Sequence, residues 1–195
     1  MNSKDKVRAI ISSTGMLHQD EIDLIVDKTV VEEFSKGEFL VKEGQVNSKC
    51  YMVVEGCIRE YRLIDGEEKT TAFYTEGDKI VSYNMEGNKG HASRSYIECL
   101  EDCVLTLSDQ DFEDDLRKLV PRLDEIIQQV AKQKISSAQE EWSTFVSSSP
   151  EERYKNLMEK RPFLFNRAPH KQIASYLGMK PQSLSRIRKR IREND

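Results

Sequence analysis

The sequence predicts an α+β protein in which a small antiparallel jelly roll precedes a long helix and a C-terminal helix-turn-helix, with or without a wing. Three observations predict this order. Glycines recur at positions 37, 44, 56, 66 and 77, an apolar stripe at helical spacing runs from Pro121 to Phe145, and a glycine turn lies within the basic segment 160–192. Each feature is justified below in chain order.

Composition places the chain among soluble globular proteins. It has 195 residues, of which 33% are charged and 37% are apolar, a balance typical of one or two domains. No apolar run approaches the roughly 20 residues that span a bilayer. The segment Met1–Lys6 lacks the apolar stretch of a signal peptide. We therefore expect a cytoplasmic protein with no membrane partner.

The jelly roll is predicted from short stretches rich in β-branched and aromatic residues between residues 29 and 108. Turn signals recur about every 8 to 12 residues, a spacing that favours an antiparallel sandwich or barrel over a parallel sheet. Before it, Lys4–Ile25 indicates short helices that pack on the barrel. The predicted strand stretches are Phe39–Val41, Tyr51–Val54, Cys57–Ile64, Thr70–Tyr74, Arg94–Leu100 and Val104–Leu107.

Neither the cysteines nor the histidines form a recognisable chemical site. The four cysteines, Cys50, Cys57, Cys99 and Cys103, contain no CxxC pair, and cytosolic thiols are normally reduced. We predict buried strand thiols, and leave open a metal or redox site because strands bring distant residues together. The three histidines lie far apart in the sequence. We therefore expect no catalytic set, no metal and no enzymatic activity.

The apolar stripe after the barrel predicts a long helix that makes a homodimer. Asp111–Lys118 indicates a short helix, and Pro121 can open the longer one, which runs toward Phe145. A helix of nearly 25 residues is about 35 Å long, more than a small barrel can cover. A helix from a second copy would bury the stripe most economically.

A serine-rich hinge separates this helix from the rest of the chain. Ser147-Ser148-Ser149-Pro150 breaks the helix, and Ser149 can cap the next one, whose first turn is acidic. The next helix is predicted over Glu151–Lys160, with Tyr154, Leu157 and Met158 on its apolar side.

The distribution of charge changes abruptly at Lys160. Residues 160–192 contain ten Lys and Arg and no Asp or Glu, whereas residues 1–159 contain 20 basic and 32 acidic residues. A dense basic segment is typical of a polyanion binder, because cations near phosphates displace condensed counterions. Charge alone also fits a solvated arm, so the pattern within the segment decides the interpretation.

That pattern is a helix-turn-helix. Ile173, Ala174 and Leu177 mark an amphipathic run that stops at Gly178, and Pro181 suits the first turn of a new helix. At about 100° per residue, the side opposite the apolar positions of the second helix presents polar residues. Glutamine can pair with adenine and arginine with guanine in the major groove, while lysine and serine contact phosphates. The predicted contacts with double-stranded DNA are Lys171, Gln172, Lys180, Gln182, Ser183, Ser185, Arg186, Lys189 and Arg190.

The order of these parts resembles the Crp/Fnr family of bacterial transcription regulators. The resemblance rests on Phe34–Gly44, Tyr51 and Gly56–Tyr61 in the barrel and on Ile173–Gly178 and Leu184–Lys189 in the helix-turn-helix. It implies a cyclic-nucleotide-binding-type sensor and a dimer that binds a pseudo-palindromic operator, with Gln182, Ser183 and Arg186 facing the bases. It also implies three parts: a sensor domain over residues 1–118, a dimerisation helix over 119–147 and a DNA-binding domain over 148–195.

The sequence departs from the family pattern in the sensor. Family members that bind cyclic AMP carry a Gly-Glu pair after the Gly-Asp turn, whereas Gly77–Ile80 is followed here by Val81-Ser82. A carboxylate for the ribose is thereby lost, so cyclic AMP is disfavoured and the effector is an unknown small or anionic molecule. Iron–sulfur sensing is disfavoured because no cysteine precedes Cys50. The candidate effector-binding residues are Ser82, Tyr83, Arg94 and Ser95.

Two further expectations concern the C-terminal part. A closing strand after the second helix of the motif is absent from the sequence, so any wing must come from Pro162–Arg167. The alternative to a DNA-binding regulator is a ligand-binding regulatory module whose basic C-terminal end docks a protein or RNA.

Overall fold

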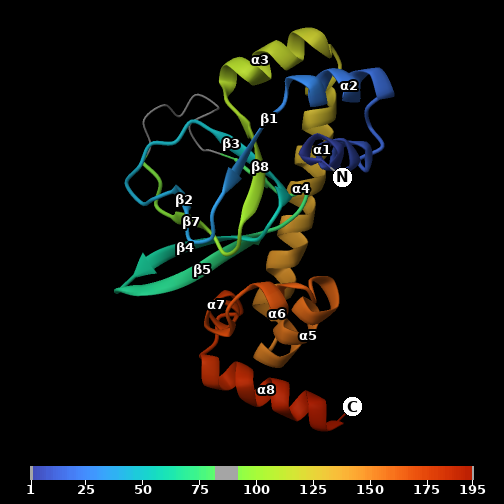
Figure 1. Ribbon diagram of the computed structural model, residues 1–195. Coiled ribbons are helices and arrows are strands. Elements are labelled where there is room, and N and C mark those ends of the chain that lie inside the picture. The colour runs from blue at the N-terminus through green and yellow to red at the C-terminus, as the bar shows by residue number, and fades with distance from the viewer. Residues whose placement is uncertain (1, 82–91, 195) are drawn as a thin grey trace. The chain divides into compact units, whose positions relative to one another are not determined.

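The structure is a computed structural model that describes residues 2–81 and 92–194. Its strands form two four-stranded sheets, ordered β1-β8-β3-β6 and β2-β7-β4-β5 (Figure 1). Strands that are distant in sequence lie side by side in both sheets, so the predicted jelly roll is confirmed. The strands are β1 (Val30–Phe34), β2 (Phe39–Val41), β3 (Cys50–Glu55), β4 (Ile58–Ile64), β5 (Glu67–Tyr74), β6 (Lys79–Ile80), β7 (Tyr96–Cys99) and β8 (Cys103–Ser108).

Strand β8 lies between β1 and β3 and pairs antiparallel with both. Val30 lies opposite Leu107 in the pairing with β1, and Tyr51 lies opposite the same leucine in the pairing with β3. The sequence did not predict β1 or β6. Two adjacent glutamates, Glu32 and Glu33, interrupt the apolar pattern of β1, and β6 has only two residues.

The core of the jelly roll is closely packed and apolar. Val53, Ile58 and Leu105 have no exposed surface, and Cys99 and Cys103 belong to the same cluster. Each fully buried aliphatic side chain contributes about 1.5–3 kcal/mol of transfer free energy.

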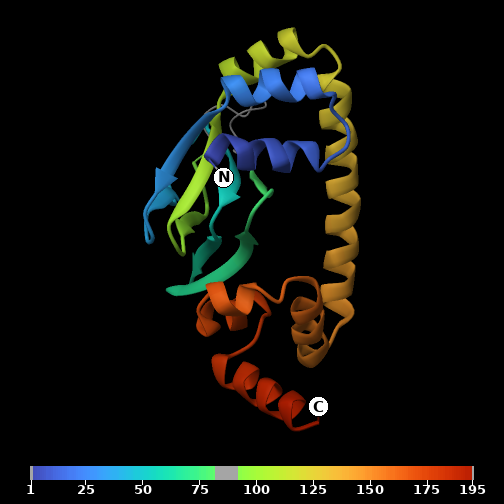
Figure 2. The ribbon, with the colours of Figure 1, turned by 45° about the vertical axis from the view of Figure 1, so that its right-hand side comes forward.

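Two N-terminal helices cover part of the barrel, as predicted. Helix α1 (Ser3–Ser12) begins after Asn2, whose side chain accepts a hydrogen bond from the Asp5 amide at 2.8 Å. Helix α2 (Gln19–Lys28) packs beside α1 (Figure 2). Val7 and Ile22 form a buried cluster with Met52 of β3.

The helices after the barrel confirm the prediction with small shifts in their ends. Helix α3 (Gln110–Leu119) is capped by Asp109, which accepts from the Phe112 amide at 2.9 Å. Helix α4 (Leu123–Ser147) has 25 residues and begins two residues after Pro121, because residues 121–122 form a turn.

Four further helices complete the chain. Ser149 caps the first of them and forms a reciprocal capping box with Glu152, as its position after the hinge predicted. Pro162–Arg167, the segment from which any wing would have to come, forms a turn and a helix instead. Pro162 and Phe163 form the turn, which leads directly into α6. The helices are α5 (Pro150–Lys160), α6 (Leu164–Arg167), α7 (His170–Tyr176) and α8 (Pro181–Asn194).

The chain divides into two compact units. The first comprises Met1–Glu60 and Phe73–Val130, and the second comprises Tyr61–Ala72 and Ala131–Asp195. This division runs through α4 and through the hairpin of β4 and β5. Our predicted limits lie at the end of α3 and at the end of α4, so the three-part organisation stays a prediction.

Candidate nucleic-acid interface and sensor site

The turn between α7 and α8 has the geometry that the sequence predicted. Gly178 has a φ of +69°, a left-handed conformation that favours glycine. The Met179 amide donates to the Ala174 carbonyl at 2.9 Å, and the Gly178 amide donates to the Ser175 carbonyl at 3.0 Å. These two bonds form a Schellman motif, which ends α7. Pro181 then opens α8.

Apolar contacts fix α8 against the rest of the second unit. Leu184 and Ile187 are buried on one side of α8, and Ile173, Ala174 and Leu177 are buried on α7 and in the turn. The predicted inward positions are therefore confirmed. Because these positions face inward, the opposite side of α8 is available to a partner.

Four of the predicted side chains lie together on this outer face of α8. Gln182, Ser185, Arg186 and Lys189 are exposed, whereas Ser183 is half-buried. The Ser185 hydroxyl donates to the Pro181 carbonyl at 3.1 Å, which orients it locally. Helix α8 is the red helix in Figure 1. Its outer face presents amide, hydroxyl and cationic groups of the kinds that read base edges and phosphates.

The predicted phosphate contacts differ in their surroundings. Lys171, in α7, and Lys180, just before α8, are exposed. Gln172 is half-buried, and its Oε1 is buried without a hydrogen-bond partner among the described residues. The structure therefore places Gln172 apart from the exposed cations.

Arg190 already has an anionic partner. It donates to the Glu151 carboxylate in the first turn of α5, which also lies 3.0 Å from the Lys155 ammonium. The Lys155 ammonium, with the Arg190 guanidinium, holds the pKa of the Glu151 carboxyl below its usual value. A phosphate contact from Arg190 would therefore require this guanidinium to exchange a carboxylate for a phosphate.

Sequence reasoning missed a contact between the two helices of the motif. Arg188 is half-buried, and its Nη1 contacts both ring nitrogens of His170. This contact joins the start of α7 to the middle of α8. Nothing in the basic run distinguishes Arg188 from the exposed cations beside it, except that its helical angle lies nearer the buried side.

Helix α4 exposes its apolar stripe. Every residue from 131 to 143 is exposed, and the exposed fractions of Ile135, Trp142 and Val146 are 60%, 68% and 59%. Val130 is half-buried and belongs to a different side of the helix. Contiguous exposed apolar surface of this kind marks an interaction site.

The predicted effector-binding residues are not all described by the structure. Ser82 and Tyr83 lie outside the described residues. Ser95 is buried, and its amide donates to the Ser93 hydroxyl at 3.1 Å. Arg94, next to it, is exposed, so the structure does not place this guanidinium inside the barrel.

A different arginine is buried in the sensor. Arg59, on β4, is 2% exposed, and its Nη1 donates to the carboxylate of Glu98 on the neighbouring strand β7 at 3.2 Å. A buried charge is stable only with partners of this kind. The sequence signal was a basic residue at the buried start of a strand, directly after Cys57 and Ile58.

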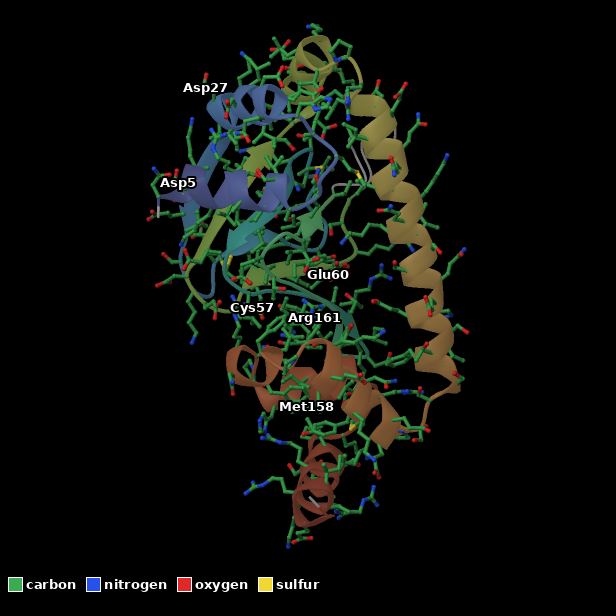
Figure 3. The ribbon with its side chains drawn as sticks, turned by 90° about the vertical axis from the view of Figure 1, so that its right-hand side faces the viewer. Asp5, Asp27, Cys57, Glu60, Met158 and Arg161 are labelled. Carbon is green, nitrogen blue, oxygen red and sulfur yellow. The ribbon has the colours of Figure 1, made fainter. Side chains whose placement is uncertain are left out.

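The four cysteines form no disulfide and are buried, as predicted. Gly56 approaches Cys103 so closely that a Cβ at position 56 would lie 2.4 Å from the Cys103 Sγ. The Cys99 thiol contacts Cys103, and this hydrogen bond raises the pKa of Cys99 and lowers that of Cys103. Cys57, labelled in Figure 3, accepts from the Cys103 thiol through its carbonyl at 3.8 Å.

The described residues contain neither a metal-binding cluster nor a membrane-spanning helix. Within residues 2–81 and 92–194, no group of three or more His, Cys, Asp or Glu side chains is placed to hold a metal ion. In the same residues, no helix combines the length and apolarity needed to cross a membrane.

The barrel matches a known protein family, and most of the chain is similar to known transcriptional activators. A family model described as Cyclic nucleotide-binding domain matches residues 31–118. The transcriptional activator protein Anr of Pseudomonas protegens is 23% identical in an alignment of 195 positions, which covers 94% of this chain and 78% of Anr. The transcriptional activator protein FnrA of Stutzerimonas stutzeri is 24% identical over 194 residues, which cover 93% of this chain and 78% of FnrA.

Solved structures show the same fold. FixK2 from Bradyrhizobium japonicum superposes with a TM-score of 0.68 at 17% identity over 85% of each chain. A CooA mutant from Carboxydothermus hydrogenoformans gives 0.65 at 15% identity, over 88% of this chain and 79% of that one.

Fold and interface together define a protein in which a cyclic nucleotide-binding-type barrel is followed by a long helix and a helix-turn-helix. The chain contains a cyclic nucleotide-binding domain and, along most of its length, is similar to transcriptional activators, as the resemblance to the Crp/Fnr family of transcription regulators implies. The resemblance that the sequence suggested is thereby confirmed.

Proposed function

We propose that this protein is a dimeric, sequence-specific DNA-binding transcription regulator whose barrel senses an effector other than cyclic AMP. The observation that carries the proposal is the outer face of α8, where Gln182, Arg186 and Lys189 are exposed together on a helix that a helix-turn-helix core holds in place. Such a helix can enter the major groove with its N-terminal residues against base edges.

The exposed stripe of α4 supports the dimer. Large apolar side chains on 131–146 remain in water in the single chain. A second copy of the same helix is self-complementary and would bury them around a two-fold axis. Two recognition helices related by this axis would prefer a pseudo-palindrome.

Selection from random duplex DNA tests the proposal. The protein should enrich a pseudo-palindrome whose half-sites lie about 10 bp apart, or a multiple of that distance. Enrichment of no duplex sequence, with or without enrichment from a parallel pool of random single-stranded RNA, would instead support the alternative in which the basic end docks RNA or a protein.

Two features of the sensor argue against a cyclic nucleotide. Val81-Ser82 replaces the Gly-Glu pair of the cyclic AMP-binding relatives, and Arg94 is exposed. Inside the barrel the buried cation is Arg59, already paired with Glu98. A small anion that exchanges with this carboxylate would be chemically suited to the site.

Cyclic AMP is expected not to bind at physiological concentration. The ribose hydroxyl would lack its carboxylate acceptor, and losing such a hydrogen bond to a charged group costs about 1.5–3 kcal/mol. Isothermal calorimetry measures this directly. The double variant Val81→Gly, Ser82→Glu restores the pair and is the matched control, expected to bind more tightly than wild type. A dissociation constant in the low micromolar range for wild type would contradict the prediction.

A further inference from the structure

Arg153, on α5, contacts the ends of two other helices of the second unit. Its Nε donates to the Phe145 carbonyl on α4 at 2.9 Å, and its Nη1 donates to the Leu177 carbonyl after α7 at 3.4 Å. The guanidinium carbon lies 4.0 Å from the centre of the Phe145 ring. We call these three contacts of Arg153 the Arg153 bridge.

Each of the two carbonyls lacks the amide donor that a continuing helix would supply. The Phe145 carbonyl would accept from Ser149, but that amide donates to the capping carboxylate of α5 at 2.8 Å. The Leu177 carbonyl would accept from residue 181, which is Pro181 and has no N–H. Unpaired carbonyls at a helix C-terminus carry partial negative charge. A guanidinium therefore suits both ends in hydrogen bonding and in charge.

The glycine of the turn makes room for this side chain. A Cβ at Gly178 would lie 3.3 Å from Nη1 of Arg153 and 3.7 Å from Cζ of Phe145. Gly178 therefore permits both the left-handed turn and the close approach of the guanidinium. The bridge and the helix-turn-helix depend on the same position.

Other packing between α4 and the motif is incomplete at this point. A groove of about 140 Å³, open to solvent, lies between α4, α5 and α7, and Phe145, Arg153, Leu157 and Leu177 are among the residues that line it. Arg161, labelled in Figure 3, lines it as well. Across this groove the contacts of Arg153 link α4 to the motif, while the Ser175 hydroxyl links α7 to β5 through the Thr70 amide and the Glu68 carbonyl.

We propose that Arg153 is a positioning residue that sets the angle between α4 and α8, and through it the half-site spacing that the dimer accepts. The proposal rests on the proposed function, since spacing has meaning only for a dimer that binds DNA. Only two residues, Ser148 and Ser149, link α4 to α5. Without the bridge, rotation at this link would let α8 take several orientations.

Selection of DNA sites with variable spacing tests the proposal. Wild type should enrich one half-site spacing, whereas Arg153→Met should enrich several. Its affinity for the wild-type site should fall about tenfold, as expected for the loss of a hydrogen bond to a charged group. Arg153→Lys keeps the charge and one donor group but lacks the planar fork, and should give an intermediate result.

Lys155→Met is the matched control, because it removes one positive charge from α5 and leaves the bridge intact. It should keep the wild-type spacing. If Arg153→Met enriches the same single spacing with unchanged affinity, the proposal is overturned. A general loss of stability would lower affinity at every spacing and leave the preferred spacing unchanged, so it would also overturn the proposal.

A second measurement needs no DNA. Nitroxide labels on Ser136→Cys in α4 and Glu193→Cys in α8, with labelled subunits diluted in unlabelled ones, report the distance between the helices by electron spin resonance. Wild type and Lys155→Met should give one narrow distance distribution, and Arg153→Met a wider one. If wild type enriches no DNA sequence, the proposed function fails, and the distance measurement alone tests the role of the Arg153 bridge. Distance distributions of equal width for wild type and Arg153→Met would then overturn that role.

Discussion

Ile135→Asp is expected to convert the dimer into a monomer. Ile135 is 60% exposed in the single chain and lies on the apolar stripe of α4. A two-fold axis places the new charge in the interface twice, without a cationic partner for either copy. Burying an unpaired charge costs several kcal/mol, about the size of effect that separates a micromolar from a millimolar dimer. Sedimentation velocity at micromolar concentration measures the change.

The matched control is Gln133→Asp, which adds the same charge to the opposite side of α4. Gln133 is exposed, so this variant should remain a dimer. We choose Ile135 over Val130, which the sequence also suggested, because Val130 is half-buried in the single chain. An unchanged dimer for Ile135→Asp would mean that the interface lies elsewhere.

Arg186→Ala is expected to reduce affinity for the preferred operator and to leave binding to random DNA nearly unchanged. Arg186 is exposed on the outer face of α8, where a guanidinium can pair with guanine. Loss of such a contact costs about 1–3 kcal/mol on the operator. Fluorescence anisotropy on both kinds of DNA, titrated with salt, measures the difference.

Lys171→Ala is the contrasting variant, since an exposed lysine at the start of α7 is placed for phosphate rather than for bases. It should weaken both kinds of DNA alike and lower the salt slope by about one. Arg190→Ala should have a smaller effect on the slope, because Arg190 is paired with Glu151 in the free protein. Equal losses on operator and random DNA for Arg186→Ala would identify the basic segment as a general polyanion surface.

The parts of the fold that follow local rules could be predicted from the sequence. Gly178, Pro181 and the apolar spacing of α8 define the helix-turn-helix, because each has one conformational preference and all agree. Ser149 marks the start of α5 in the same way, through its capping box with Glu152. The outer face of α8 follows from helical geometry alone, so its residues can be predicted from the sequence.

What the sequence could not give depends on contacts between distant residues. The pairing of Arg59 with Glu98 joins two strands that only the sheet order brings together. Arg153 is one basic residue among many, and its importance lies in two carbonyls that belong to other helices. The sequence left open whether Pro162–Arg167 forms a wing, because nothing in this segment indicates that it continues as a helix after the turn.

In the proposed dimer, the exposure of residues 131–143 in the single chain would make protein concentration part of the regulation. If these side chains are covered only by a second copy, the concentration of dimer rises with the square of the concentration of free chain at low abundance. The occupancy of an operator would then rise more than in proportion to the concentration of the protein. A cell could therefore change the output of this regulator by altering its rate of synthesis or degradation, with the effector held constant.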